Sequence, residues 1–141
     1  MSDTLFNLDI LTPTTHYDVK KVKEVKVITD NGEITILSHH EEYLGNVEIS
    51  LLVVVNEDNT SEYYAVNGGV VHFDNEANTC KLMLNKIYNA KDIDLEKVKQ
   101  QKEDALNKLK SNLTNYEHKE AERSLRKALN KQLIKDLYGK Q

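Results

Sequence analysis

The distribution of glycine and proline divides this chain into two parts with different secondary structure. Neither residue occurs between Gly69 and Gly139, whereas the stretch up to Gly69 holds the single proline and four of the five glycines. Up to about residue 87, short runs rich in valine and isoleucine alternate with turn-forming glycine pairs, a pattern typical of turn-linked strands. After residue 88, leucine and alanine recur three and four positions apart, the period of an amphipathic helix. The sequence therefore predicts an all-β sandwich or barrel followed by an α-helical hairpin.

The first predicted domain covers residues 1–88. Its strands follow one another without an intervening helix, which favours an antiparallel β-sandwich or barrel. Three glycine-containing segments are expected to be turns or bends: residues 30–32, 45–46 and 67–69. The apolar run 51–55 should be buried on both faces. Cys80 is the only cysteine, so no intrachain disulfide can form, and this indicates a reducing compartment. Cys80 itself should lie on a strand in the core.

The second predicted domain covers residues 89–141. Asp92 or Asp94 should cap the first helix, Thr114 and Asn115 should form the turn, and Gly139 should end the second helix. The side chains expected to meet between the helices are nearly all leucine or alanine: Leu95, Val98, Ala105, Leu106, Leu109, Leu113, Ala121, Leu125, Ala128, Leu129, Leu133, Ile134 and Leu137. Two such helices bury too little apolar surface to be stable alone, so the hairpin must pack on the β domain, on itself by folding back, or on another protein.

Charge is divided at the same boundary. The chain carries a net charge of -4, but its first 88 residues sum to -8 and the remainder to +4. A basic second domain favours acidic surfaces or phosphates as partners. The sequence pI of about 5.7 and the absence of known motifs argue against nucleic-acid binding. The sequence also has no signal-peptide pattern and no segment near the ~20 apolar residues that span a bilayer.

The consecutive residues His39, His40, Glu41 and Glu42 are the one cluster with metal-ligand chemistry. Adjacent residues of an extended chain point to opposite sides, so His39 and His40 are poorly placed to share one ion. There is no nucleophile elbow, phosphate-binding glycine loop or spaced carboxylate pair. We therefore expect no metal site and no catalytic activity, and keep a metal-dependent enzyme only as an alternative.

The order of three motifs carries a family resemblance. Gly-Glu-x-x-Ile-Leu-x-x-His occupies residues 32–40, Tyr-Ala-Val-Asn-Gly-Gly occupies residues 64–69, and Asp-Ile-Asp at residues 92–94 opens the helical hairpin. Together they resemble the epsilon subunit of F-type ATP synthases over nearly the whole chain. The family usually has Pro-Gly before the histidine and proline two residues after it, where this chain has Ser38, His39 and Glu42. This loop is expected to depart from the family shape.

The resemblance implies a non-catalytic rotor subunit, peripheral to the cytoplasmic face of a bacterial membrane. In the family the sandwich binds the gamma subunit and sits on the c-ring, so Glu33 and His40 are the candidate contacts with those partners. The helical arm either folds back or extends along gamma toward the catalytic alpha and beta subunits, where it hinders ATP hydrolysis. The basic charge of residues 89–141 fits an acidic docking surface on that catalytic head.

The resemblance also implies a candidate site for ATP, as a regulatory ligand rather than a required cofactor. Some bacterial relatives bind ATP through an Ile/Leu-Asp-x-x-Arg-Ala motif and two arginines four residues apart. The matching positions here are Ile93, Asp94, Lys97, Lys127 and Lys131. Each arginine is replaced by lysine, which keeps the positive charge but loses the planar fork that binds phosphate bidentately. A free-standing ATP-sensing module without rotary partners is a second alternative.

Overall fold

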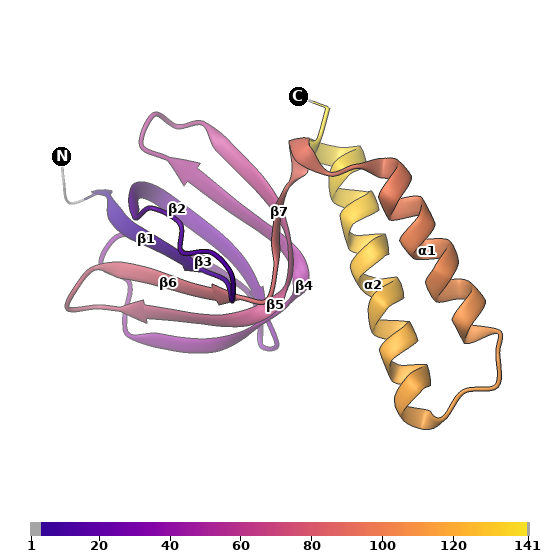
Figure 1. The fold of residues 1–141 in the computed structure, drawn as a ribbon. Coiled ribbons are helices and arrows are strands. Elements are labelled where there is room, and N and C mark those ends of the chain that lie inside the picture. The colour runs from indigo at the N-terminus through magenta and orange to yellow at the C-terminus, as the bar shows by residue number, and fades with distance from the viewer. Residues whose placement is uncertain (1–3, 141) are drawn as a thin grey trace. The chain divides into compact units, whose positions relative to one another are not determined.

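The computed structural model describes residues 4–140 of the chain. The chain divides into two compact units, residues 1–88 and residues 89–141. Figure 1 shows the first as a set of strands and the second as a pair of helices. The two units are described separately below.

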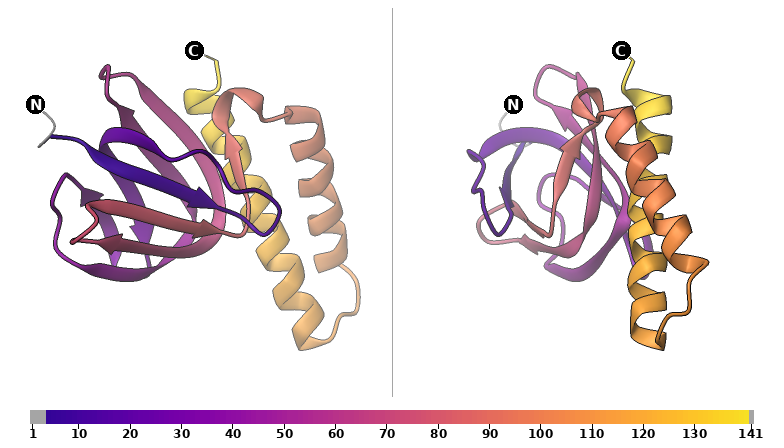
Figure 2. Two further views of the ribbon diagram at one scale, coloured as in Figure 1. Left: turned by 60° about the vertical axis from the view of Figure 1, so that its left-hand side comes forward. Right: turned by 45° about the vertical axis from the view of Figure 1, so that its right-hand side comes forward.

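Seven strands form the first unit, and the last of them extends one residue into the second. They are β1 (Phe6–Leu11), β2 (Lys20–Thr29), β3 (Gly32–Ile36), β4 (Tyr43–Asn56), β5 (Ser61–Asp74), β6 (Thr79–Leu84) and β7 (Ile87–Asn89). The sheet order is β1-β6-β5-β4-β2-β3, with β7 paired to β5. A further pairing of β1 with β2 closes five of these strands into a barrel, and Figure 2 shows them wrapped around a common interior.

One strand pair departs from the expected antiparallel arrangement. β1 runs parallel to β6, in a register that extends from Asn7 opposite Thr79 to Leu11 opposite Met83. The sequence pattern could not reveal this pair, because it joins strands that are far apart in the chain. Since β1 also pairs with β2, the parallel contact closes the five-stranded barrel and leaves no open edge on β1 or β6.

Two of the predicted turns lie inside long strands. Residues 45–46 belong to β4 and residues 67–69 to β5, and each of these strands has 14 residues. Gly68 (φ 87°) and Gly69 (φ 152°) adopt backbone conformations that favour glycine. A Cβ atom on Gly69 would also overlap the carbonyl oxygen of Met83 on β6. These glycines therefore let a strand bend within the barrel, whereas the predicted turn at residues 30–32 does connect β2 to β3.

The barrel is filled by large apolar side chains. In the run 51–55 only Leu52 and Val54 are buried, so the expectation of two-sided burial is wrong, and the run alternates as a barrel strand must. Phe6 and Phe73 meet edge to face, with ring centroids 5.9 Å apart. Cys80 is buried on β6 as predicted, and that burial raises the pKa of its thiol to about 12.

The second unit is an antiparallel helical hairpin. It comprises a short 3₁₀ helix η2 (Ala90–Asp92), α1 (Leu95–Leu109) and α2 (Asn115–Tyr138). Asp94, not Asp92, caps α1, since its carboxylate accepts the Glu96 N–H at 3.0 Å. Gly139 ends α2 as predicted. A Cβ atom there would lie 2.6 Å from the carbonyl oxygen of Ala90, so the glycine also allows close packing.

The start of α2 differs from the expected turn. Asn115 is the first residue of the helix, and Thr114 caps it. The Thr114 hydroxyl accepts the Glu117 N–H at 3.2 Å, and the Glu117 carboxylate accepts the Thr114 N–H at 3.2 Å. This reciprocal capping box satisfies donors that a helix start otherwise leaves unpaired. It also lowers the pKa of Glu117, chiefly through the backbone hydrogen bond of Thr114 and then through its hydroxyl.

Few of the predicted leucines lie between the helices. Leu106, Leu129, Leu133 and Leu137 are exposed, which corrects the predicted apolar faces. The other leucines of that set, Leu95, Leu109, Leu113 and Leu125, are only half-buried. The buried residues of the two helices are Val98, Ala105, Ala121, Ala128, Lys131 and Ile134. Alanines let two helix backbones approach closely, and this packing turns α2 so that its leucines face outward.

Candidate functional site

The start of α1 positions the first three residues of the candidate ATP site. Ile93 lies just before the helix and is buried, with 6% of its surface exposed. The carboxylate of Asp94 is engaged in capping the helix, where it accepts N–H groups of Glu96 and Lys97. The side chain of Lys97 is exposed one turn into the helix. In this structure Asp94 therefore has a structural role that needs no ligand.

Lys131 is the most unusual residue of the candidate site. Its side chain is buried, with 7% of the residue exposed, and its Nζ donates to Oε1 of Gln101 on α1 at 2.8 Å. Lys127 lies one turn earlier on α2 and is half-buried, and Lys97 lies one turn before Gln101. The structure therefore brings the ammonium group of Lys131 to the α1 side of α2, where it contacts Gln101.

Sequence reasoning did not identify Gln101. The available signal was its spacing of four residues from Lys97, which places both on one helix face. A neutral amide beside a buried ammonium satisfies one of its donors without neutralising its charge.

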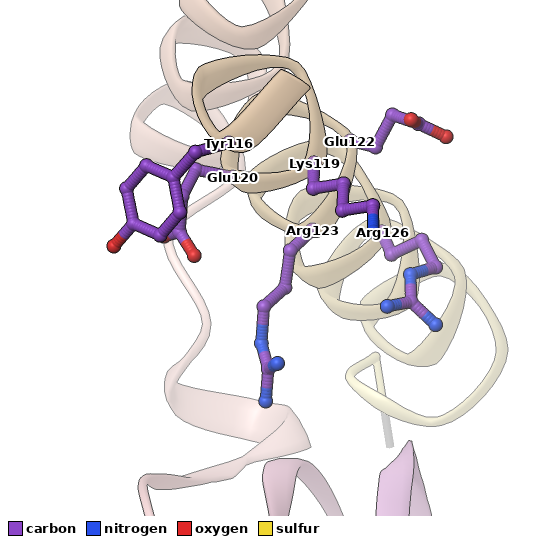
Figure 3. Close-up of a pocket in the computed structure, with 6 residues that line it drawn as sticks. All are labelled: Tyr116, Lys119, Glu120, Glu122, Arg123 and Arg126. Atoms are coloured by element: carbon purple, nitrogen blue, oxygen red, sulfur yellow. The ribbon is translucent and has the colours of Figure 1, made fainter. Parts of the chain in front are cut away.

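A second basic group lies on the outer surface of α2. Figure 3 shows the side chains of Lys119, Arg123 and Arg126 projecting from the helix, with Tyr116 and Glu120 next to each other. Within residues 4–140, none of these three cations has a hydrogen bond or ion pair. On the same surface, Oε1 of Glu122 lies 3.3 Å from Nε2 of His118. Three unpaired cations on one helix make this surface available to an acidic partner.

The two barrel residues predicted as partner contacts lie in different settings. Glu33 is exposed near the start of β3, opposite Ile28 of β2. His40 lies in the loop after β3 and is half-buried. Its ring packs edge to face on Phe73 and Tyr43, with centroid distances of 5.6 and 6.3 Å. His40 therefore helps to cover the end of the barrel core, while Glu33 is directly accessible.

Two exposed leucines flank the same loop and were missed by the sequence analysis. Leu37 follows β3 with 52% exposure, and Leu44 lies on β4 with 71% exposure. Their apolar character at outward positions was the available signal, because an exposed apolar side chain on a strand interrupts the usual alternation. The loop thus presents apolar side chains on either side of polar residues, a composition common at protein interfaces.

The histidine and glutamate cluster has its own internal partners. His40 Nδ1 lies 2.8 Å from the carbonyl oxygen of Glu41, and His72 Nε2 lies 2.8 Å from the Glu42 carboxylate. Across the described part of the chain, residues 4–140, no three His, Cys, Asp or Glu side chains are arranged to hold a metal ion. No described helix is both long and apolar enough to cross a membrane.

The sequence of the barrel decides the family. Residues 5–89, more than half of the chain, match the family described as ATP synthase, Delta/Epsilon chain, beta-sandwich domain. The chain belongs to this ATP synthase family. An ATP synthase epsilon chain of Pediococcus pentosaceus is 31% identical over 133 residues, which are 92% of this chain and 94% of the relative. An epsilon chain of Staphylococcus aureus is 30% identical over 132 residues, or 93% and 96% of the two chains.

Solved structures of ATP synthases have the same fold as this family member. A chain of the Euglena gracilis mitochondrial ATP synthase, in a structure of OSCP, F1 and the c-ring, superposes with a TM-score of 0.80 at 19% identity. It covers 92% of this chain, which in turn covers 81% of that chain. A chain from the central stalk and c-ring of the Tetrahymena thermophila enzyme gives 0.63 at 15% identity, with 92% and 96% covered. At these identities the comparison shows the fold alone.

Proposed function

We propose that this chain is the epsilon subunit of an F-type ATP synthase, a non-catalytic part of the central stalk that turns with the gamma subunit and the c-ring. The observation that carries the proposal is the extent of the match to the epsilon chains. It covers more than 90% of both chains, and therefore includes the helical hairpin as well as the barrel. Association with the membrane would then occur through the complex.

The closed barrel suits the anchoring half of this role. Its core residues are nearly inaccessible, and its strands leave few open edges, so it can transmit torque without rearranging. The candidate contact surface comprises Glu33, the loop with His40, and the exposed Leu37 and Leu44. We propose that this surface meets gamma or the c-ring.

The helical hairpin is suited to the regulatory part of the proposed role. We propose that its exposed cations are held by acidic segments of the catalytic alpha and beta subunits, where the helices hinder rotation and thus ATP hydrolysis. The unpaired cations Lys119, Arg123 and Arg126 support this assignment. The exposed Leu129, Leu133 and Leu137 on the same helix supply an apolar contact.

Deletion of residues 89–141 tests both halves in the reconstituted complex. The truncated chain should still assemble with gamma, and ATP hydrolysis by the complex should rise. Unchanged hydrolysis would remove the regulatory half of the proposal, whereas loss of assembly would contradict the assignment of anchoring to the barrel. Failure of the full chain to copurify with gamma, together with ATP binding, would favour a free-standing nucleotide sensor.

A charge-neutralising variant separates the basic surface from the bulk of the hairpin. In R123Q/R126Q the helix remains intact while two unpaired guanidinium groups are lost, so hydrolysis should rise toward the level of the deletion. The matched control is K99Q/K108Q, which removes two exposed cations from α1. Equal effects of the two variants would show that overall charge, rather than this surface, is responsible.

We also propose ATP as a regulatory ligand of the hairpin, held by the ammonium groups of Lys97, Lys127 and Lys131. The buried ammonium group of Lys131 supports a phosphate site there, because its hydrogen bond to an ionised phosphate would be stronger than its bond to the neutral amide of Gln101. ATP should then raise the thermal stability of the isolated chain, since a ligand that binds only the folded form must stabilise it. The shift should disappear in K127Q and persist in R123Q; no shift in the unmodified chain would refute ATP binding.

A further inference from the structure

The chain contains two Asn-Gly pairs, Asn31-Gly32 and Asn67-Gly68. This dipeptide is the one most prone to spontaneous loss of ammonia, because glycine has no Cβ atom to keep its backbone nitrogen away from the preceding side-chain amide. The chemistry of the two pairs is the same. Any difference in their reactivity in the folded protein must therefore come from their surroundings.

The pair Asn31-Gly32 lies in an exposed turn. Asp30 and Asn31 connect β2 to β3, and both Asn31 and Gly32 are exposed. No residue of the described range 4–140 bonds to the side-chain amide of Asn31. Gly32 has a φ of 105°, and no atom lies within 4 Å of the position that a Cβ atom would take on it. The side chain of Asn31 therefore has open space in which to approach the Gly32 nitrogen.

One hydroxyl group holds the backbone of this turn. Oγ1 of Thr29 accepts the N–H of Asn31 at 3.1 Å and donates to the carbonyl oxygen of Gly32 at 2.9 Å. Both bonds are local to the end of a hairpin, where opening requires much less free energy than in the core strands. The turn can therefore rotate into the geometry of cyclisation while the barrel stays folded.

The pair Asn67-Gly68 lies within β5 and is enclosed, and Asn67 is only 5% exposed. The N–H of Asn67 donates to the carbonyl of Lys86 at 3.1 Å, and the carbonyl of Asn67 accepts Nδ2 of Asn85 at 3.2 Å. The carbonyl of Gly68 accepts the N–H of Asn85 at 2.9 Å, and a Cβ atom on Gly68 would lie 3.3 Å from the carbonyl oxygen of Val47. Cyclisation at this pair therefore requires β5 itself to open.

We propose that Asn31 is a site of spontaneous deamidation in the folded chain, and that the barrel protects Asn67 from the same reaction. The backbone nitrogen of Gly32 attacks Cγ of Asn31, so an N–Cγ bond forms and the Cγ–Nδ2 bond breaks. The proton lost from the Gly32 nitrogen is balanced by the one that Nδ2 gains as it leaves as ammonia. Water then opens the resulting cyclic imide at either carbonyl, which gives aspartate or β-linked isoaspartate.

Either product places a carboxylate between Asp30 and Glu33, where the unmodified chain has a neutral amide. Isoaspartate also adds a methylene group to the main chain just before β3. Because β3 is the last strand in the sheet order, the longer backbone disturbs only its pairing with β2. The inference concerns the barrel alone and stands whether or not the proposed function is correct.

Incubation of the full chain at mildly alkaline pH tests the site, because the deprotonated backbone nitrogen is the nucleophile. Peptide mass spectrometry locates the change from amide to carboxylate, and methylation by an isoaspartyl methyltransferase detects the β-linked product. In the folded chain, Asn67 should convert roughly 1,000-fold or more slowly than Asn31, since opening a core strand requires nearly the whole free energy of unfolding. In denaturing urea the two sites should convert at similar rates, because the unfolded chain encloses neither.

The variant N31Q removes the site, because glutamine would have to form a larger and less favourable ring. Isoaspartate in the peptide that spans the β2–β3 turn should then disappear. The matched control is N107Q, which changes an exposed asparagine of α1 and should leave conversion at Asn31 unchanged. An intact Asn31 in the folded chain, over a period in which the chain in urea converts, would overturn the proposal. Equal rates at Asn31 and Asn67 in the folded chain would also contradict it.

Discussion

The barrel and the hairpin of this chain have different interiors. The barrel buries Phe6, Phe73 and Leu82 almost completely, whereas the buried residues of α1 and α2 include three alanines and a lysine. Large apolar side chains contribute roughly 1.5–3 kcal/mol each on burial, and an alanine contributes far less. The same chain thus combines a unit that is stable through its own core with one that depends on additional contacts.

The largest expected effect is a difference in stability between the two units when each is made as a separate fragment. A fragment of residues 1–88 should unfold cooperatively, because it retains the closed barrel. A fragment of residues 89–141 should lose most of its helix content in water, because two helices with an alanine interface bury too little apolar surface. Circular dichroism of the two fragments measures this directly. A stable, cooperatively melting 89–141 fragment would break the comparison.

Removing a large side chain from the barrel should have the next largest effect. Phe73→Ala eliminates the ring that packs on Phe6 and His40, and should lower the free energy of unfolding of the barrel by about 3–5 kcal/mol. Phe73→Leu is the control and should cost much less, since it keeps most of the volume. Chemical denaturation, followed by a probe in the barrel, gives both values. Equal losses would mean that the site collapses around any smaller residue.

Replacing Lys131 should make the hairpin more stable and so reduce its difference in stability from the barrel. Lys131→Met keeps the length of the side chain and removes a buried ammonium group, so it should stabilise the hairpin by about 1 kcal/mol. Gln101 is exposed and can turn to water. Slower hydrogen exchange in α1 and α2 would show the effect, and Lys99→Met on the exposed face should have none. A less stable Lys131→Met hairpin would mean that Lys131 contributes more through its contacts than its burial costs.

The smallest expected effect concerns the start of α2. Because the pKa of Glu117 is lowered by the capping box, its contribution is present above the ordinary value of 4.5 and is lost as the pH falls below it. Amides in the first turn of α2 should therefore exchange faster, relative to intrinsic rates, at pH 3.5 than at pH 6. The neutral variant Glu117→Gln should show no such change. If it did, the capping carboxylate would not be the cause.

Local signals in the sequence were sufficient for the type of secondary structure in each unit and for two of the helix ends. The absence of glycine and proline after Gly69 anticipated the hairpin, and the residues Asp94 and Gly139 marked its limits. Cys80 among leucines on β6 was correctly predicted to be buried. Each of these features depends on residues close together in the chain, which is where sequence patterns are most reliable.

Features that depend on distant residues were not predictable in this way. Gly68 and Gly69 were interpreted as a break between strands, whereas the barrel uses them to bend β5 against β6. The seam of the hairpin follows the predicted alanines but not the predicted leucines, and the burial of Lys131 and its contact with Gln101 were missed. The periodicity of a helix identifies an apolar face but not which part of it a partner covers.

The parallel pairing of β1 with β6 has a consequence for how the protein is made. Every registered pair between these strands joins residues 72 positions apart. During synthesis, β1 leaves the ribosome long before its neighbour exists, and it has only β2 to pair with in the interval. Closing such a distant contact is slow because of its loop entropy, so completion of the barrel must await the emergence of β6.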